Sequence, residues 1–225
     1  MLPEERLKVR VEFSKTGSLK FISHLDLART MKAAFLRSKL PIWYTMGFNP
    51  HPKLVFSVPL SVGTASKCEF MDFMLTENVS GDEIVKKLND AFPADLRAKR
   101  AYTPESRFCD IGWARYSICL ITNNADENTC EKIKDLFEGQ VIVSKTTKTG
   151  TKEIDISSLC DIESVIKSDA GIEISVLLSC GENTFVNPKH IIDKIEEKMP
   201  ELLSGGDYTV CREAVFLSDK TTPFM

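Results

Sequence analysis

The strongest constraint on the fold is a segment of strict alternation near the start of the chain. From Leu7 to Phe13, apolar residues take every second position and charged residues take the others. This period of two is typical of a β-strand with one buried face and one polar face. Its backbone needs neighbouring strands, and its apolar face needs a second layer to cover it. We therefore look for further strands and for the helices that pack on them.

The first half supplies two helices and four more strands. Ser23 is a suitable N-cap, and the segment from Leu25 to Lys39 consists of strong helix formers. Pro41 ends this helix, because the residue before a proline is driven out of the helical region. Ser80 is the N-cap of a second helix at about residues 80–91. The further strands are predicted at residues 41–46, 54–59, 67–75 and 96–103.

The second half has a similar order of elements. Helices are predicted at residues 126–138 and 187–199, and strands at 113–122, 141–143, 153–156, 162–166, 172–178 and 208–217. The first half reads β-α-β-β-β-α-β, which is a βαββαβ unit with one extra strand. The predicted fold class is α+β, with two tandem ferredoxin-like halves that have antiparallel sheets and helices on one face. We place the domains at residues 1–107 and 108–225.

The charges are distributed unevenly between these halves. Residues 1–107 contain 17 Lys and Arg against 12 Asp and Glu, whereas the remainder contains 12 against 20. A basic N-terminal part on an acidic chain favours a confined anion-binding face over a general nucleic-acid coat. A chance fluctuation of surface charge is the alternative.

Basic residues gather on the first predicted helix. At 100° per residue, Arg29, Lys32 and Lys39 fall on one exposed side, with no acidic residue among them. Cations at helical spacing are commonly solvated surface. They can equally hold the phosphates of RNA, and we name these three residues as candidate ligands of such a substrate.

The loop after this helix is the second candidate. Pro50 and Pro52 bracket His51 and fix backbone angles on both sides of it. Such a loop is rigid and would present Asn49, His51 and Lys53 in a set geometry. Pro-rich turns often only connect strands, so a connecting role stays open. Three nearby aromatic residues could stack on bases, namely Trp43, Tyr44 and Phe48.

His51 and His24 are the candidates for acid–base catalysis near neutral pH. His24 could instead pack at the edge of the core. The chain has no Gly-rich phosphate loop, no HExxH and no GxSxG. Whether the protein is an enzyme is therefore left open.

Seven cysteines are spread along the chain, and no two are closer than ten residues. This spacing excludes CxxC pairs, so we expect buried reduced thiols, no metal site and no cofactor. The N-terminus lacks the basic-then-apolar order of a signal peptide, and no run of residues is apolar enough to span a bilayer. We expect a cytoplasmic protein.

Three strings in the first third of the chain resemble a known family. They are GSLKFISHLDLAR, LPIWYTMGFNPHPKLVFSVPLSVGTAS and EFMDF, and the motifs SHLDL and GFNPHPK are the most specific. They are similar to the radical-SAM-linked protein family, a domain of unknown function found beside, or fused C-terminal to, an uncharacterised radical SAM protein. The resemblance is dense over about residues 6–75 and implies a radical SAM protein as partner. This chain has no CxxxCxxC cluster motif of its own.

These observations lead to one preferred function and two alternatives. We expect an accessory protein of a radical SAM enzyme that binds RNA or another phosphate-bearing substrate through its basic N-terminal face. The first alternative is a metal-independent RNA-processing enzyme that uses His51. The second is a protein-interaction subunit that touches no nucleic acid.

Overall fold

A computed structural model describes residues 6–123, 125–147, 150–181, 184–203 and 207–225. The chain forms two compact units, residues 1–108 with Met225 and residues 109–224. Each unit combines helices with an antiparallel sheet, which confirms the predicted α+β class. Short 3-10 helices lie at Gly17–Phe21, Phe108–Asp110, Ser157–Leu159 and Pro200–Leu202.

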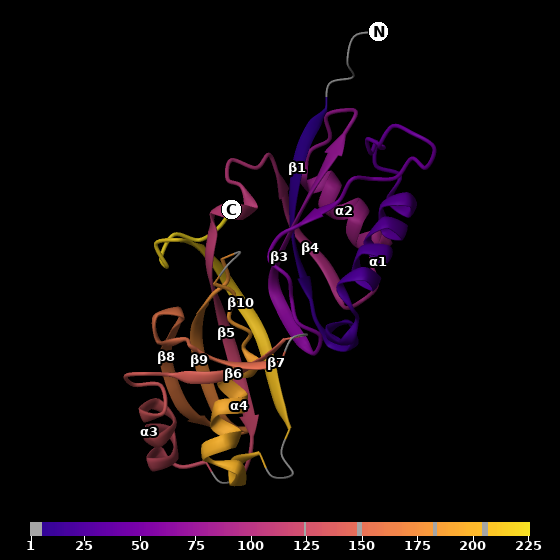
Figure 1. The fold of residues 1–225 in the computed structure, drawn as a ribbon. Helices are drawn as coiled ribbons and strands as arrows, with labels where there is room; N and C mark the ends of the chain where they lie inside the picture. The colour runs from indigo at the N-terminus through magenta and orange to yellow at the C-terminus, as the bar shows by residue number, and fades with distance from the viewer. Residues whose placement is uncertain (1–5, 124, 148–149, 182–183, 204–206) are drawn as a thin grey trace. The chain divides into compact units, whose positions relative to one another are not determined.

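The first unit is a four-stranded sheet with two helices on one face (Figure 1). Its strands lie in the order β4-β1-β3-β2, and each neighbouring pair is antiparallel. The elements in chain order are β1 (Leu7–Lys15), α1 (His24–Ser38), β2 (Val55–Phe56), β3 (Thr64–Leu75), α2 (Gly81–Ala91) and β4 (Leu96–Tyr102).

The helix starts follow from their caps. The hydroxyl of Ser23 accepts a hydrogen bond from the backbone N–H of Asp26 at 3.2 Å, and Ser80 does the same for Glu83 at 3.3 Å. Each bond satisfies a backbone donor that has no partner within its own helix. Helix α1 ends because Lys39 adopts a left-handed conformation, with φ of 56°.

The prediction of a strand at residues 41–46 is wrong. The structure has only two isolated bridges there, Ile42 with Leu75 and Tyr44 with Pro52. The second bridge joins Tyr44 to Pro52 in the same loop. The segment therefore folds back on itself and does not extend its pairing with β3. Proline has no backbone N–H to donate, so the ladder cannot continue past it.

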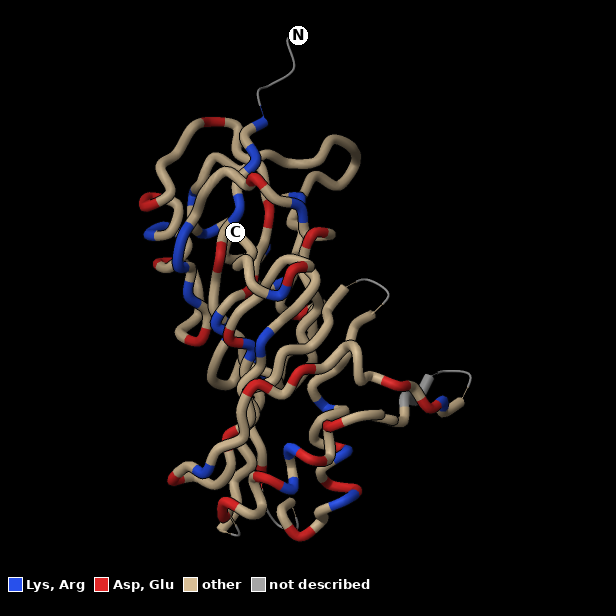
Figure 2. The backbone as a smooth tube through the Cα atoms, turned by 90° about the vertical axis from the view of Figure 1, so that its left-hand side faces the viewer, with Lys and Arg blue, Asp and Glu red and all other residues tan. Residues whose placement is uncertain are grey.

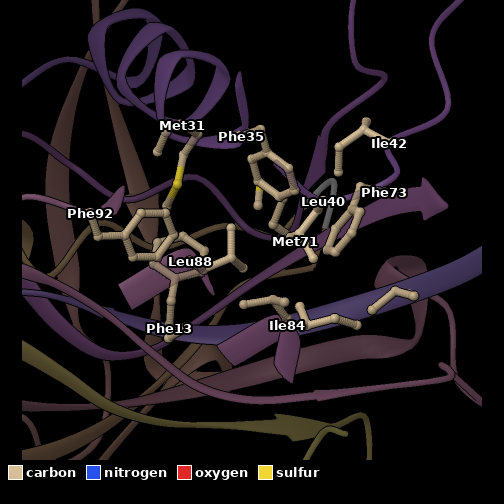
Figure 3. Packing of buried hydrophobic residues seen from close by; sticks show 14 of the residues in the cluster. Phe13, Met31, Phe35, Leu40, Ile42, Met71, Phe73, Ile84, Leu88 and Phe92 are labelled. Atoms are coloured by element: carbon tan, nitrogen blue, oxygen red, sulfur yellow. The ribbon is translucent and has the colours of Figure 1, made fainter. Parts of the chain in front are cut away.

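The alternation in β1 produces a two-sided sheet. Val9, Val11 and Phe13 enter the core beneath α1 and α2. There the rings of Phe35 and Phe73 meet edge to face, with centroids 4.7 Å apart (Figure 3). Burying each such side chain contributes about 1.5–3 kcal/mol. The core therefore attaches both helices to one face of the sheet.

The opposite face of β1 carries a buried ion pair. Arg10 of β1 lies directly across from Asp72 of β3. The guanidinium Nε donates to one carboxylate oxygen of Asp72 at 2.7 Å, and Nη2 donates to the other at 3.0 Å. Its remaining N–H groups donate to the hydroxyl and carbonyl of Ser106 and to the main-chain oxygen of Met225. All five donors of a side chain with no solvent exposure are thus satisfied.

The second unit has a four-stranded antiparallel sheet in the order β10-β5-β9-β8 and a separate two-stranded sheet, β6-β7. Helices α3 and α4 contribute Ile133, Ile191 and Ile195 to its buried residues. The bounds are β5 (Ile111–Ile121), α3 (Glu127–Asp135), β6 (Ile142–Thr147), β7 (Gly150–Asp155), β8 (Cys160–Ser168), β9 (Gly171–Ser179), α4 (Lys189–Lys198) and β10 (Tyr208–Leu217).

All seven cysteines are free thiols. Cys109 is exposed, whereas burial raises the pKa of Cys160 and of Cys180 to about 12. Within the described parts of the chain, no helix has the length and apolar character needed to cross a membrane.

We predict that Asp72→Ala lowers the free energy of unfolding by about 3–5 kcal/mol, because it leaves the Arg10 guanidinium buried without its counter-charge. Urea denaturation of the full chain measures the change. Asp90→Ala, which removes an exposed carboxylate from α2, should change the stability by less than about 0.5 kcal/mol. Replacing both partners, with Arg10→Met and Asp72→Leu, should recover most of the loss; equal stability of Asp72→Ala and wild type would contradict the prediction.

We also predict that an aromatic disulfide reagent at pH 8 labels Cys109 first. Only the thiolate reacts, and a thiol with a pKa of about 12 is ionised in about one molecule in ten thousand at this pH. Cys160 and Cys180 should therefore react only in denaturant. Absorbance at 412 nm follows the reaction, and Cys109→Ser should remove the fast phase. Rapid labelling of Cys160 or Cys180 in the native protein would be inconsistent with this burial.

Candidate functional site

A cavity of about 330 Å³ lies on the first unit, within the size range of small-molecule sites. Three of its lining residues are cations and one is an acid, and the rest are apolar. We call it the Lys53 pocket, and its lining consists of Lys8, Lys53, Val55, Asp72, Phe73, Met74, Arg107 and Phe108.

The pocket carries a surplus of positive charge. Its only carboxylate, Asp72, forms the buried pair with Arg10, and Lys8 also approaches it at 2.9 Å. Lys53 is exposed and has no ion-pair partner among the residues that the structure describes. Arg107 adds a further exposed cation. Because Arg10 and Lys8 both contact the acid, the exposed ammonium of Lys53 is the charge that favours an anionic ligand.

The strands and their register place these side chains. Lys8 and Arg10 share the polar face of β1, and the register of β1 with β3 sets Asp72 beside them. Val55 of β2 pairs with Asp72 from the other side of β3. The segment after β4 forms a wall, where the ring of Phe108 lies 4.3 Å from the Arg10 guanidinium carbon.

The segment leading into Lys53 is a loop closed by its own hydrogen bonds. We call residues 44–52 the Phe48 loop; it forms part of the long connection that follows α1 (Figure 1) and leads to β2. The backbone N–H of Thr45 donates to the carbonyl of His51 at 3.0 Å, and the N–H of His51 donates to the Thr45 hydroxyl at 3.2 Å. These bonds and the bridge of Tyr44 to Pro52 hold the base of the loop.

The tip of the Phe48 loop is apolar and solvent-exposed. Met46 is 88% exposed and Phe48 is fully exposed. Between Leu40 and Lys53 the sequence has no charged residue, and this loop is tan throughout in Figure 2. An exposed aromatic ring on a closed loop is a surface that can stack on a planar ligand.

His51 is oriented by its own loop. Its Nδ1 lies 2.8 Å from the carbonyl oxygen of Asn49, which can only accept a hydrogen bond. Nδ1 therefore carries the proton of the neutral ring, and Nε2 remains as the acceptor. The ring of His24 instead meets Phe56 edge-on, with centroids 5.1 Å apart. The two histidines thus have different neighbours.

The predicted site residues fall into two groups. Lys53 lines the pocket, and Phe48, Asn49 and His51 lie in the loop just before it. The helix cations lie elsewhere, because α1 covers the core face of the sheet and the pocket uses the polar face of β1. These helix cations are Arg29 and Lys32 on α1 and Lys39 at its C-cap.

The prediction of a helix stripe without acids is wrong for Arg29. Its guanidinium pairs with the carboxylate of Asp26 at 3.1 Å, three residues earlier on the helix. Trp43 is also less available for stacking than predicted, because the Arg6 guanidinium carbon lies 4.3 Å from its ring centroid. Phe48 is the freest of the three predicted stacking residues.

Sequence reasoning missed most of the pocket. Lys8 belongs to an alternating strand whose polar face is entirely charged, and that signal was available. Asp72, Arg107 and Phe108 lie 64 to 100 residues further along the chain, so only strand register and the path of the chain after β4 reveal their proximity. The lining contains no His, Cys or Ser, and its residue types bind anions rather than transfer protons.

Comparison with protein families gives a match over most of the chain. A model described as an uncharacterised protein conserved in bacteria, DUF2344, matches residues 8–188. This range includes the four charged residues of the pocket and the entire Phe48 loop. No curated protein matches the chain significantly. Because the matched range covers well over half of its length, the chain belongs to the DUF2344 family of proteins conserved in bacteria.

Proposed function

We propose that this protein binds RNA and holds a phosphate group of the strand in the Lys53 pocket. The observation that carries the proposal is the exposed ammonium of Lys53, which has no ion-pair partner among the described residues and lines the pocket beside a carboxylate that Arg10 and Lys8 already contact. Phosphate contacts from Lys and Arg supply most of the affinity in such complexes. The N-terminal unit also carries the basic excess of the chain.

The Phe48 loop supports RNA over a phosphate ion alone. Phe48 and Tyr44 are exposed, and both belong to the loop that leads directly into Lys53. Stacking of a base on an aromatic ring contributes about 1–3 kcal/mol and works with any base sequence. A strand whose phosphate lies near Lys53 would bring its bases within reach of this loop.

We predict that Lys53→Glu weakens binding to a fluorescent single-stranded RNA 12-mer at least tenfold at 50 mM salt, because it replaces an attractive charge with a repulsive one. Fluorescence anisotropy over 50–200 mM salt measures the affinity. Lys86→Glu reverses an exposed cation of α2 outside the pocket lining and serves as the matched control. Absence of binding by the wild type at low salt, or equal loss in both variants, would overturn the proposal.

We further propose that the protein acts beside a radical SAM protein. The support is the resemblance of residues 6–75, with the motifs SHLDL and GFNPHPK. Affinity-tagged protein on a column should retain a purified radical SAM protein from the same organism, and a Phe48→Asp variant tests whether the exposed loop tip contributes. Failure of the two purified proteins to associate at micromolar concentration would remove this part of the proposal and leave RNA binding standing.

RNA cleavage is a second candidate, favoured by the geometry of His51. A ring whose Nδ1–H is held by a carbonyl keeps Nε2 free to accept a proton, as a general base must. If this is correct, the protein cleaves RNA in the presence of EDTA, and His51→Ala abolishes the cleavage whereas His24→Ala does not. Intact RNA after incubation with the wild type would leave only the binding function.

The two units also support our interpretation as tandem ferredoxin-like folds. Counting only strands of each main sheet, both units place the fourth strand first, then the first, third and second, with a helix after the first and third strands. The hairpin β6-β7 is then an insertion in the second unit.

A further inference from the structure

We propose that the outer face of α1 is a docking site for an amphipathic helix of a partner protein, apolar at its two ends and acidic at its centre. The site goes beyond the proposed function, because α1 covers the core face of the sheet whereas the Lys53 pocket uses the polar face of β1. We call its four exposed side chains the outer row of α1, and they are Leu25, Arg29, Lys32 and Leu36.

Helical geometry places the outer row in one line along α1. At about 100° per residue, Arg29, Lys32 and Leu36 lie within about 40° of the direction in which Leu25 points. The buried residue Ala34 points to the opposite side. Intervals of four, three and four residues are the spacing with which one helix packs along another. The row therefore has the length and spacing that a second helix can follow.

The outer row is apolar at both ends and cationic at its centre. Leu25 is 59% exposed and Leu36 is 63% exposed. Arg29 is already paired with Asp26 at 3.1 Å, so its charge is largely satisfied. Lys32 is exposed and has no ion-pair partner among the residues that the structure describes. The ammonium of Lys32 is therefore the charge that the centre of a partner helix would meet.

The apolar surface continues beyond the Leu25 end of the row. Phe21 is 63% exposed and Val62 is 62% exposed. The backbone N–H of Gly63 donates to the carbonyl of Lys20 at 2.8 Å, so the segments that carry these two side chains touch each other. Exposed apolar side chains that gather in this way mark interaction surfaces on folded proteins.

The sequence around the outer row favours an acidic partner. After Asp26, no Asp or Glu occurs before Glu69, so the rest of α1 and the whole connection to β3 lack acidic residues. An acidic side chain near Lys32 would thus meet no like charge from this part of the chain. Complementary charge of this kind guides association and excludes partners of the wrong sign.

The same pattern distinguishes between possible occupants. A second copy docked through its own outer row would bring the cations of both chains together, and like charges repel. RNA would contact the cations but would leave Leu25 and Leu36 against a charged backbone. A helix with Leu or Ile at its ends and Asp or Glu at its centre complements both the apolar and the cationic parts of the row.

The test uses two synthetic peptides of one design as probes. Both have Leu at the positions that would face Leu25 and Leu36 and neutral residues elsewhere, and the two central positions are Glu in one peptide and Lys in the other. A side-chain staple keeps both helical, because short isolated helices are marginal in water. We expect the Glu peptide to bind the full chain at least tenfold more tightly than the Lys peptide at 50 mM salt, as measured by isothermal titration.

Variants assign the preference to the outer row. Lys32→Glu should reduce it to less than threefold, whereas Lys86→Glu, which reverses an exposed cation of α2, should leave it unchanged. Leu36→Ala should weaken binding of the Glu peptide at least threefold, because it removes an apolar contact at one end. Circular dichroism and the thermal midpoint verify that each variant is folded. Equal binding of the two peptides, or equal effects of Lys32→Glu and Lys86→Glu, would overturn the proposal.

A photo-crosslinking amino acid in place of Leu36, in cells that make the full chain, identifies the natural occupant. Mass spectrometry should find it joined to a protein segment with helical spacing of apolar residues and with Asp or Glu between them. A product that contains RNA, a second copy of this chain or a segment without that pattern would overturn the assigned occupant. Absence of any crosslinked product would overturn the docking site.

Failure of this inference and failure of the proposed function are distinguishable, since the two sites share no residue. Loss of peptide binding in Lys32→Glu with unchanged RNA affinity supports helix docking as a separate function. Loss of RNA binding in Lys32→Glu as strong as in Lys53→Glu would instead assign the outer row to RNA and overturn the proposal. If the wild type binds the Glu peptide but no RNA, the docking site stands and the RNA function is removed.

Discussion

The buried pair of Arg10 and Asp72 is the interaction on which the first unit and its pocket depend. It joins β1 to β3, and the remaining donors of Arg10 hold Ser106 in the segment after β4. A buried ion pair adds little net stability compared with apolar residues of the same size. The pair fits the observed register of β1 and β3, and a shift of one residue in β1 would turn Arg10 toward the apolar core.

The two faces of this sheet differ in composition. One face of β1 is covered by α1 and α2 and contains the apolar core. The other face carries Lys8 and Arg10, and the closed Phe48 loop delivers Lys53 to the pocket that Lys8 lines. Since the two faces share one backbone, the core that fixes β1 and β3 also fixes the positions of Lys8 and Asp72. Lys8 and Asp72 lie on strands, whereas Lys53 and Arg107 lie in the segments before β2 and after β4.

Local sequence patterns predicted much of the fold. Ser23 and Ser80 begin helices as expected, because capping depends on residues within one turn of each other. The strand at residues 208–217 has the predicted bounds, since alternation is also a local signal. The segment 41–46 failed because its strand formers lie before a proline-closed turn and find no continuous partner. Within the site, the prolines of the sequence indicated the rigid loop, and its charge indicated Lys53 as a candidate ligand-binding residue.

The sequence by itself determined which residues are apolar, where the helices begin and that the basic residues gather in the N-terminal half. Those properties depend on neighbours a few positions apart. Only the tertiary structure decided that the helix cations lie apart from the pocket and that Lys8, Asp72 and Arg107 surround it with Lys53. Lys8 and Asp72, 64 residues apart, lie close together because β1 pairs with β3, and no local pattern encodes that register.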